Sequence, residues 1–147
     1  MMNNKKILLV EDNPDDIELT LRAFRKNNIK NEIIIKRDGA EAVDFFFGKD
    51  GVAVNNCNDL PILTMLDLKL PKIDGLDVLK KIRSDKRTKL IPVVILTSSN
   101  EQSDLLSGYE LGCNSYIRKP VDFNQFTDTV KQLGFYWLLI NEIPLVK

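Results

Sequence analysis

Short apolar runs alternate along this chain with segments in which apolar residues recur every three or four positions. The runs are three to five residues long and rich in Ile, Leu and Val, which is typical of strands buried on both faces of a sheet. Strands that alternate with helices pair in parallel through right-handed crossovers, so the pattern predicts an α/β fold with a doubly wound, five-stranded parallel sheet. We expect its strands at residues 7–10, 33–35, 62–66, 93–96 and 115–118.

The segments between these runs carry the start and end signals of helices. Asn13 followed by Pro14 is a cap and a residue suited to the first helical turn, and Asp122 is a cap for the last helix. Gly112 should close the fourth helix. That helix is expected to begin at a cap at Ser99 or Asn100 and to pack through Leu105, Leu106 and Leu111.

The length of 147 residues predicts one domain over residues 1–147, with a core at about 5–137 and an apolar tail at 138–147. Lys plus Arg and Asp plus Glu both total 21, so no net charge draws the chain to nucleic acid or to an anionic membrane. The apolar runs are too short for a signal-peptide core or a membrane span. We therefore expect a cytoplasmic protein that binds neither nucleic acid nor a membrane.

The chain contains no histidine, which excludes Ser-His and Cys-His nucleophilic catalysis, imidazole metal ligands and a phosphohistidine. Cys57 and Cys113 lie too far apart for a metal-binding CxxC motif. We expect both to be reduced, partly buried thiols.

Polar residues follow four of the expected strands. Glu11 and Asp12 follow the first strand, Asp67 the third, Thr97 the fourth and Lys119 the fifth. Each alone would be an ordinary cap, strand or turn residue, but ligands bind at the carboxyl edge of such sheets and all five should meet there. Carboxylates that close together repel, and a hard divalent cation such as Mg²⁺, with Lys119 beside it, would relieve the repulsion.

These residue types suit the handling of a phosphoryl group. A hydroxyl on Thr97 and the ammonium of Lys119 would hold its oxygens. Asp67 is the nucleophile that requires no base, and carboxylates form acyl phosphates.

Four segments carrying these residues, at 7–13, 66–75, 92–99 and 116–120, resemble the receiver domain of response regulators, a flavodoxin-like (βα)5 fold. The resemblance implies that Glu11 and Asp12 position Mg²⁺ with Asp67, which is the phosphoacceptor. It also implies that Thr97 and Lys119 contact the phosphoryl group.

The same resemblance assigns three further residues. It implies that Tyr116 is an aromatic switch that turns inward when Thr97 moves, that a cis bond joins Lys119 to Pro120, and that the Lys69 backbone carbonyl is a metal ligand. As a hypothesis of our own, the Lys69 side chain covers the phosphoryl site or pairs with Glu11, and so changes the lifetime of the phosphoryl group.

The chain departs from compact receivers by extra length in the loop Gly48–Asp59. That loop and the segment Phe135–Leu138 are similar to stand-alone regulators that partner bacterial phytochromes. The apolar excess of the tail indicates an interface, and we expect a homodimer through this end.

The function implied is that of a two-component response regulator without an output domain, which is not itself an enzyme. Its partner would be a sensor histidine kinase or a histidine phosphotransfer protein, and its downstream partner stays open. The alternative is a phosphorylation-independent interaction module. A dehalogenase-type phosphohydrolase would need an Asp where Lys69 stands, and Glu11 and Asp12 would repel the phosphate of FMN in a flavodoxin-like binder.

Overall fold

The computed structural model describes residues 5–48 and 60–144, and Cys57 and most of the expected Gly48–Asp59 loop lie outside those ranges. Within these ranges, five strands alternate with five α-helices, and a π-helix follows the last α-helix. The strands are β1 (Lys6–Val10), β2 (Glu32–Lys36), β3 (Leu63–Leu66), β4 (Val93–Thr97) and β5 (Ser115–Arg118). The helices are α1 (Pro14–Lys26), α2 (Gly39–Phe47), α3 (Gly75–Ser84), α4 (Gln102–Glu110), α5 (Phe123–Gly134) and the π-helix η3 (Phe135–Ile140).

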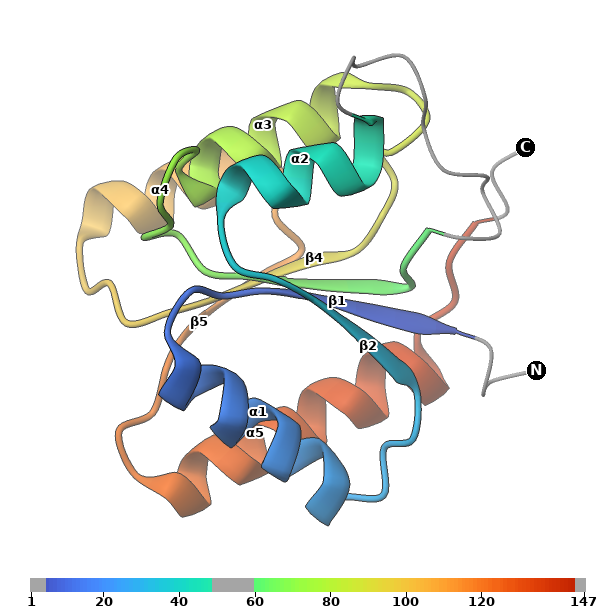
Figure 1. The fold of residues 1–147 in the computed structure, drawn as a ribbon, viewed down its shortest axis with the longest axis vertical. Coiled ribbons are helices and arrows are strands. Elements are labelled where there is room, and N and C mark those ends of the chain that lie inside the picture. Colours follow the sequence, from blue (N-terminus) through green and yellow to red (C-terminus); the bar gives the residue numbers. More distant parts are fainter. Residues whose placement is uncertain (1–4, 49–59, 145–147) are drawn as a thin grey trace.

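The five strands form one parallel sheet in the order β2-β1-β3-β4-β5, which confirms the predicted fold class. Figure 1 shows α1 and α5 on one face of this sheet and α2, α3 and α4 on the other. Each face carries its own apolar core. Phe24 of α1 packs in one, and Phe46 of α2 packs in the other.

Strand register brings the ends of β1 and β3 to the same level. Val10 pairs with Leu66, and the Asp67 amide donates to the Val10 carbonyl at 3.1 Å. Glu11 and Asp67, which follow these two strands, therefore lie side by side at one edge of the sheet. At the far side of β4, the Lys119 amide donates to the Thr97 carbonyl at 2.7 Å, which fixes the start of the β5–α5 turn.

Most of the expected helix ends are confirmed. The Asn13 side chain caps α1 by accepting from the amides of Asp15 and Asp16, and the Asp122 side chain caps α5 in the same way. Gly112 follows α4 with a φ of 97°, the left-handed conformation that favours glycine.

The prediction for the fourth helix is wrong in two respects. Its N-cap residue is Glu101, with no side-chain capping bond, rather than Ser99 or Asn100. Only Gly108 of α4 is buried, and Leu106 is 62% exposed. Of the three leucines expected to pack, only Leu106 faces solvent, because α4 packs on the sheet through Gly108. Leu105 is half-buried, and Leu111 packs against the core on the α2–α3 face.

The apolar segment after α5 is divided between the core and the surface. Leu138 is buried, and Trp137 and Ile143 pack against the core on the α1–α5 face. Four other side chains of η3 remain about half exposed, namely Phe135, Tyr136, Leu139 and Ile140. Among the described residues, no helix has the length and apolar character that a membrane crossing requires.

Candidate functional site

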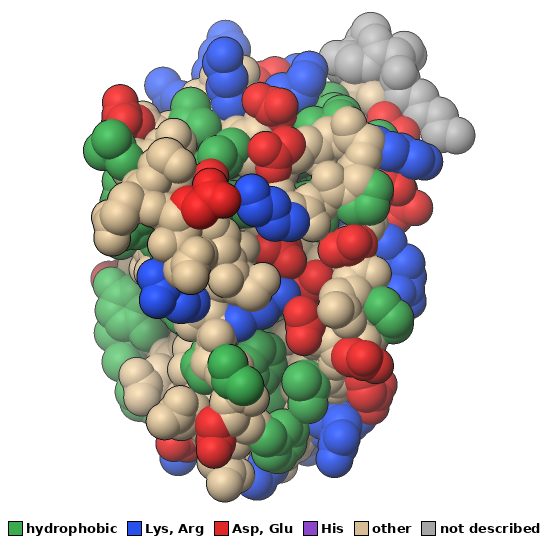
Figure 2. Space-filling model, turned by 90° about the vertical axis from the view of Figure 1, so that its left-hand side faces the viewer, with side chains coloured by type: hydrophobic (Ala, Val, Ile, Leu, Met, Phe, Trp, Pro, Cys, Tyr) green, Lys and Arg blue, Asp and Glu red, His purple; other side chains and the backbone are tan. Residues whose placement is uncertain are grey.

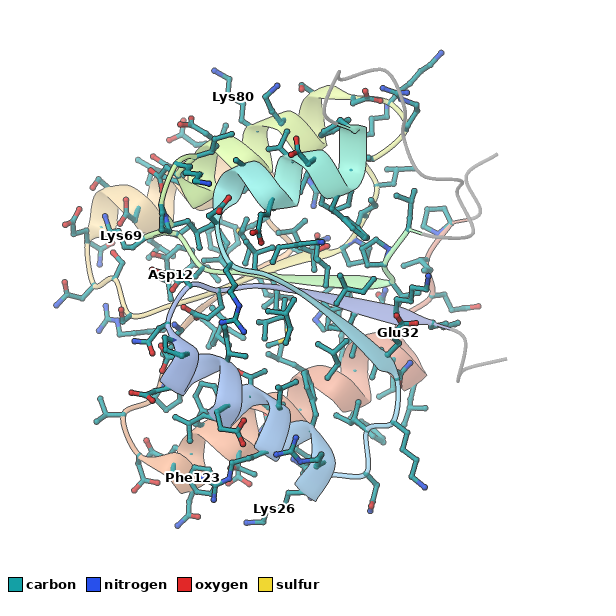
Figure 3. The ribbon with its side chains drawn as sticks, in the orientation of Figure 1. Asp12, Lys26, Glu32, Lys69, Lys80 and Phe123 are labelled. Carbon is teal, nitrogen blue, oxygen red and sulfur yellow. The ribbon has the colours of Figure 1, made fainter. Side chains whose placement is uncertain are left out.

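Three carboxylates gather where β1 and β3 end. Glu11 and Asp67 are buried and Asp12 is exposed, and one oxygen from each lies within 4.8 Å of the others. Figure 3 shows Asp12 and Lys69 at this edge of the sheet. Figure 2 views the same side of the molecule and shows acidic side chains gathered near its middle, next to basic ones. The spacing and the hard oxygen donors fit a divalent cation with retained waters.

Asp67 is held by both of its carboxylate oxygens. Its Oδ1 accepts from the amide of Leu68 at 2.7 Å, and its Oδ2 accepts from Lys119 Nζ at 3.1 Å. The side chain is buried, yet it lies at the edge of the sheet beside the exposed Asp12. The carboxylate is thus oriented before any ligand arrives.

Lys119 Nζ donates to three carboxylates, and its side chain is only 9% exposed. The distances are 2.5 Å to Glu11 Oε1, 2.8 Å to Asp16 Oδ2 and 3.1 Å to Asp67 Oδ2. Burial by itself would lower the pKa of Lys119. Its hydrogen bonds to Asp16 and Glu11 and the charge of Asp67 outweigh that effect, so the pKa lies above its ordinary value and the ammonium stays charged.

Glu11 is the carboxylate that burial affects most. Burial raises the pKa of Glu11 to about 7, although the hydrogen bond from Lys119 acts in the opposite direction. Its second oxygen accepts from the amide of Asn13 at 3.2 Å. The charge of Asp67 adds to the rise, which is the repulsion that the sequence predicts among these acids.

The two residues expected to switch lie on neighbouring strands. Thr97 is fully buried at the end of β4, and its hydroxyl accepts from the Ser99 amide at 3.2 Å. Tyr116 on β5 pairs with Ile95 on β4, and its hydroxyl has no regular hydrogen-bond partner among the described residues. Burial raises the pKa of that hydroxyl, against a smaller opposing effect of Ser99. A cavity of about 250 Å³ borders Tyr116.

Two expectations need correction. The Lys119–Pro120 bond is trans, since the described residues contain no cis peptide bond. Trans is the lower-energy form of an X–Pro bond by about 0.5–1 kcal/mol, and Lys119 reaches its three carboxylates with that bond in place.

The Lys69 side chain does not pair with Glu11. Its Nζ lies 3.5 Å from Asp104 Oδ2 in α4, and that charge is the main cause that raises the pKa of Lys69. The same Asp104 oxygen accepts from the Ser99 hydroxyl at 2.6 Å. An ion pair and a hydrogen bond, both to Asp104 of α4, therefore connect the loop after β3 with the loop after β4.

Asp16 and Asp104 are the functional candidates that sequence reasoning misses. An acid in the first turn of a helix is ordinarily a favourable partner of the helix dipole, and the pattern gives no reason to assign it more. The signal that could have found Asp16 is its place in the first turn of α1, the helix that follows the acidic pair Glu11 and Asp12.

The match to a known family covers most of the chain. Residues 7–131 match the model of the response regulator receiver domain, so the chain belongs to that family. The members of this family bind a divalent metal at an acidic pocket, and the described residues of this chain include a group of acids that could hold one, Glu11, Asp12 and Asp67.

Two curated relatives align along nearly their whole length. The probable methanogenesis regulatory protein FilR2 of Methanothrix harundinacea is 40% identical over 138 residues, which span 94% of this chain and 86% of that protein. Response regulator Rcp1 of Synechocystis is 37% identical over 140 residues, which span 95% and 93%.

Solved structures of two response regulators share the fold. The phosphorylated cyanobacterial phytochrome response regulator RcpA superposes with a TM-score of 0.85 at 38% identity, over 96% of this chain and 99% of its own. A Mn²⁺-bound form of Rcp1 superposes with a TM-score of 0.84 at 35% identity, over 96% and 99%.

Proposed function

We propose that this chain is a phosphoryl-accepting switch, in which Asp67 takes a phosphoryl group from a phosphohistidine of a partner protein. The observation that carries the proposal is the setting of Asp67, whose Oδ2 faces Lys119 while one of its oxygens lies within 4.8 Å of Glu11 and Asp12. This places a nucleophile between a fixed cationic side chain and oxygen donors for a metal ion. The Mn²⁺-bound state of Rcp1 supports a divalent cation at the corresponding acids, and we propose Mg²⁺.

In the proposed reaction, an Asp67 oxygen bonds to the phosphorus as the bond from phosphorus to the partner's histidine nitrogen breaks. Mg²⁺, when bound, neutralises charge on the transferring group. Lys119 donates hydrogen bonds to the phosphoryl oxygens, as it now does to Asp67. No proton has to be removed from the nucleophile, because a carboxylate is already ionised.

This chemistry fits a chain that has no histidine of its own to donate a phosphoryl group. We propose a sensor histidine kinase or a histidine phosphotransfer protein as the donor, and we place the exchange in the cytoplasm, where a kinase has access to ATP. The chain is then a phosphoacceptor that takes part in its own phosphorylation rather than an enzyme acting on other molecules.

We propose that the signal leaves the site through Thr97 and Tyr116. The Thr97 hydroxyl turns toward the phosphoryl oxygens, and the Tyr116 ring enters the space that becomes free. The cavity beside Tyr116 supports this, because it gives the ring space to move. Leu106, Tyr109 and Val121 are exposed on α4 and the β5–α5 turn, which supports that face as the surface a partner reads.

The decisive experiment is incubation with acetyl phosphate and Mg²⁺, followed by intact-mass and peptide mass spectrometry. We expect the gain of one phosphoryl group on Asp67, and no gain in Asp67→Asn. Asp128→Asn is a matched control, because Asp128 is exposed on α5 and lies outside the group of carboxylates that could hold a metal. Undiminished phosphorylation of Asp67→Asn would refute the assignment and favour a phosphorylation-independent module.

We propose that the Lys69 side chain influences the lifetime of the phosphoryl group on Asp67. We propose that the Lys69–Asp104 pair covers the mouth of the site, since Lys69 lies in the loop after Asp67 and Asp104 accepts from Ser99 in the loop after Thr97. Lys69→Ala and Lys69→Asn should both change the dephosphorylation rate in a pulse-chase assay. Unaltered rates in both variants would remove this role.

We further propose that the protein forms a homodimer in which the C-terminal segment of one copy packs against a second copy of the chain. The half-exposed apolar residues of η3 lie on both sides of its one buried residue, Leu138, so an apolar surface continues from the core to solvent. Size-exclusion chromatography with light scattering should report a dimer for the full chain and a monomer for Leu139→Asp. A monomeric full chain at high micromolar concentration would disprove it.

A further inference from the structure

Lys119 is held more closely by a residue of α1 than by the proposed phosphoacceptor. Its Nζ lies 2.8 Å from Asp16 Oδ2 and 3.1 Å from Asp67 Oδ2. The Asp16 side chain is 29% exposed and that of Lys119 is 9% exposed, so the contact is screened only in part. A charge-assisted hydrogen bond therefore draws the ammonium toward α1.

Local structure explains why Asp16, and not its neighbour, reaches the site. Asn13 caps the helix by accepting from the amides of both Asp15 and Asp16, which fixes their positions in the first turn. Successive helical residues point about 100° apart, since one turn takes 3.6 residues. Asp15 consequently lies exposed, while Asp16 is partly covered and contacts Lys119.

Asp16 also differs from the other acids around Lys119. Glu11 and Asp67 belong with Asp12 to the group that could hold a cation, and Asp16 does not. A cation at the site would neutralise part of the negative charge of Glu11 and Asp67. Asp16 would keep its full charge and remain the anionic partner of Lys119 in the loaded protein.

We propose that Asp16 is a positioning residue that competes with Asp67 for the Lys119 ammonium and so limits the rate of phosphorylation. The inference rests on the proposed function and names a regulator of that same site. Two electrostatic effects act in one direction. The negative charge of Asp16 repels an anionic phosphoryl donor, and its hydrogen bond holds the ammonium back from the phosphoryl oxygens.

The test compares Asp16→Asn with Asp15→Asn in the full chain. Both variants remove one negative charge from the same helical turn, but only Asp16 contacts Lys119. With acetyl phosphate and saturating Mg²⁺, we expect Asp16→Asn to be phosphorylated about three- to tenfold faster than the unaltered chain. Asp15→Asn should stay within about twofold of it.

Rescue by a conservative variant separates this role from a structural one. Asp16→Glu keeps the charge and should return the rate to that of the unaltered chain. Thermal melting shows whether each variant folds, and Asp16→Ser replaces Asp16→Asn if the latter melts at a markedly lower temperature. Equal rates for the variants at positions 15 and 16, or a slower rate at position 16, would overturn the inference.

The outcome for the unaltered chain distinguishes the two proposals. If the unaltered chain gains no phosphoryl group on Asp67, the proposed function itself fails. If it is phosphorylated and removal of the Asp16 charge has no effect on the rate, only the role of Asp16 fails.

Discussion

The backbone of Gly75 lies directly against the carbonyl group of Asp67. A Cβ atom at position 75 would lie 2.2 Å from the Asp67 carbonyl oxygen and 2.6 Å from the Leu68 Cα atom. The Gly75 amide also donates to the Leu68 carbonyl at 2.9 Å. The first residue of α3 is therefore packed against the backbone that carries the candidate phosphoacceptor.

Gly75→Ala should consequently destabilise the protein by about 1–3 kcal/mol, because both atoms in the way belong to buried backbone. Gly108→Ala is the matched control, since its nearest neighbours are side-chain atoms of Ile95 and Tyr116 at 3.0 and 3.1 Å. Urea denaturation of both variants measures the difference. Equal losses of unfolding free energy would contradict the proposed cause.

Thr64 in β3 is fully buried, and its hydroxyl has no hydrogen-bond partner in the described part of the chain. Thr64→Val removes that hydroxyl at nearly constant shape, so we expect a gain of about 1 kcal/mol in unfolding free energy. Thr88 is equally buried, but its hydroxyl donates to the Ile82 carbonyl at 2.6 Å. Thr88→Val should instead lower the unfolding free energy by about 1 kcal/mol. Chemical denaturation should therefore show changes of opposite sign in the unfolding free energies of the two variants.

Arg83 joins α3 to the segments around β4 and β5 through its guanidinium group. It donates to the carbonyl oxygens of Gly112, Ile91 and Lys89 and to the Asn114 side chain, at 2.7 to 3.0 Å. Lysine cannot reproduce this planar set of donors, so Arg83→Lys should lower the unfolding free energy by about 2–4 kcal/mol.

Arg25→Lys provides the control for Arg83→Lys. Among the residues that the structure describes, Arg25 has one ion-pair partner, the exposed Glu18, and such surface pairs contribute about 0–1 kcal/mol. Both variants keep a positive charge, so their difference in a denaturation experiment reports the geometry of the donors. A loss below about 1 kcal/mol for Arg83→Lys would show that these bonds contribute little.

Burial raises the pKa of the Cys113 thiol, with a smaller opposing effect of the nearby Arg83. A raised thiol pKa leaves less thiolate at a given pH, so Cys113 should react slowly and its rate should climb only in more alkaline solution. In a Cys57→Ser variant, we expect iodoacetamide to label the folded protein at pH 8 at least about tenfold more slowly than the same protein in urea. Equal rates would contradict this.

The sheet and the carboxylate group could be predicted from the sequence because both depend on one simple rule. Continuous Ile, Leu and Val runs indicate strands buried on both faces, and the ends of parallel strands meet at one edge. The sequence therefore predicts Glu11, Asp67 and Lys119 together, and in the structure Lys119 lies within hydrogen-bonding distance of both acids.

The parts that could not be predicted depend on where individual side chains point. The leucine spacing of α4 fits a buried stripe, but Leu106 faces solvent because a helix that packs through Gly108 presents its other side outward. Lys69 is long enough to reach several acids, and only the position of α4 decides that it pairs with Asp104. Asp16 is hidden by the ordinary preference for acids at helix starts.

The parallel sheet separates the chain's two kinds of connection. Loops that leave a strand, such as those after Val10 and Leu66, meet at the carboxylate edge, whereas segments that return from a helix enter at the opposite edge. The extra length between Phe47 and Leu63 belongs to the second kind. Doubling the length of a loop costs only about 0.6 kcal/mol of stability. An insertion at that edge can therefore add residues between Glu11 and Asp67 in the sequence while the distance between their side chains stays the same.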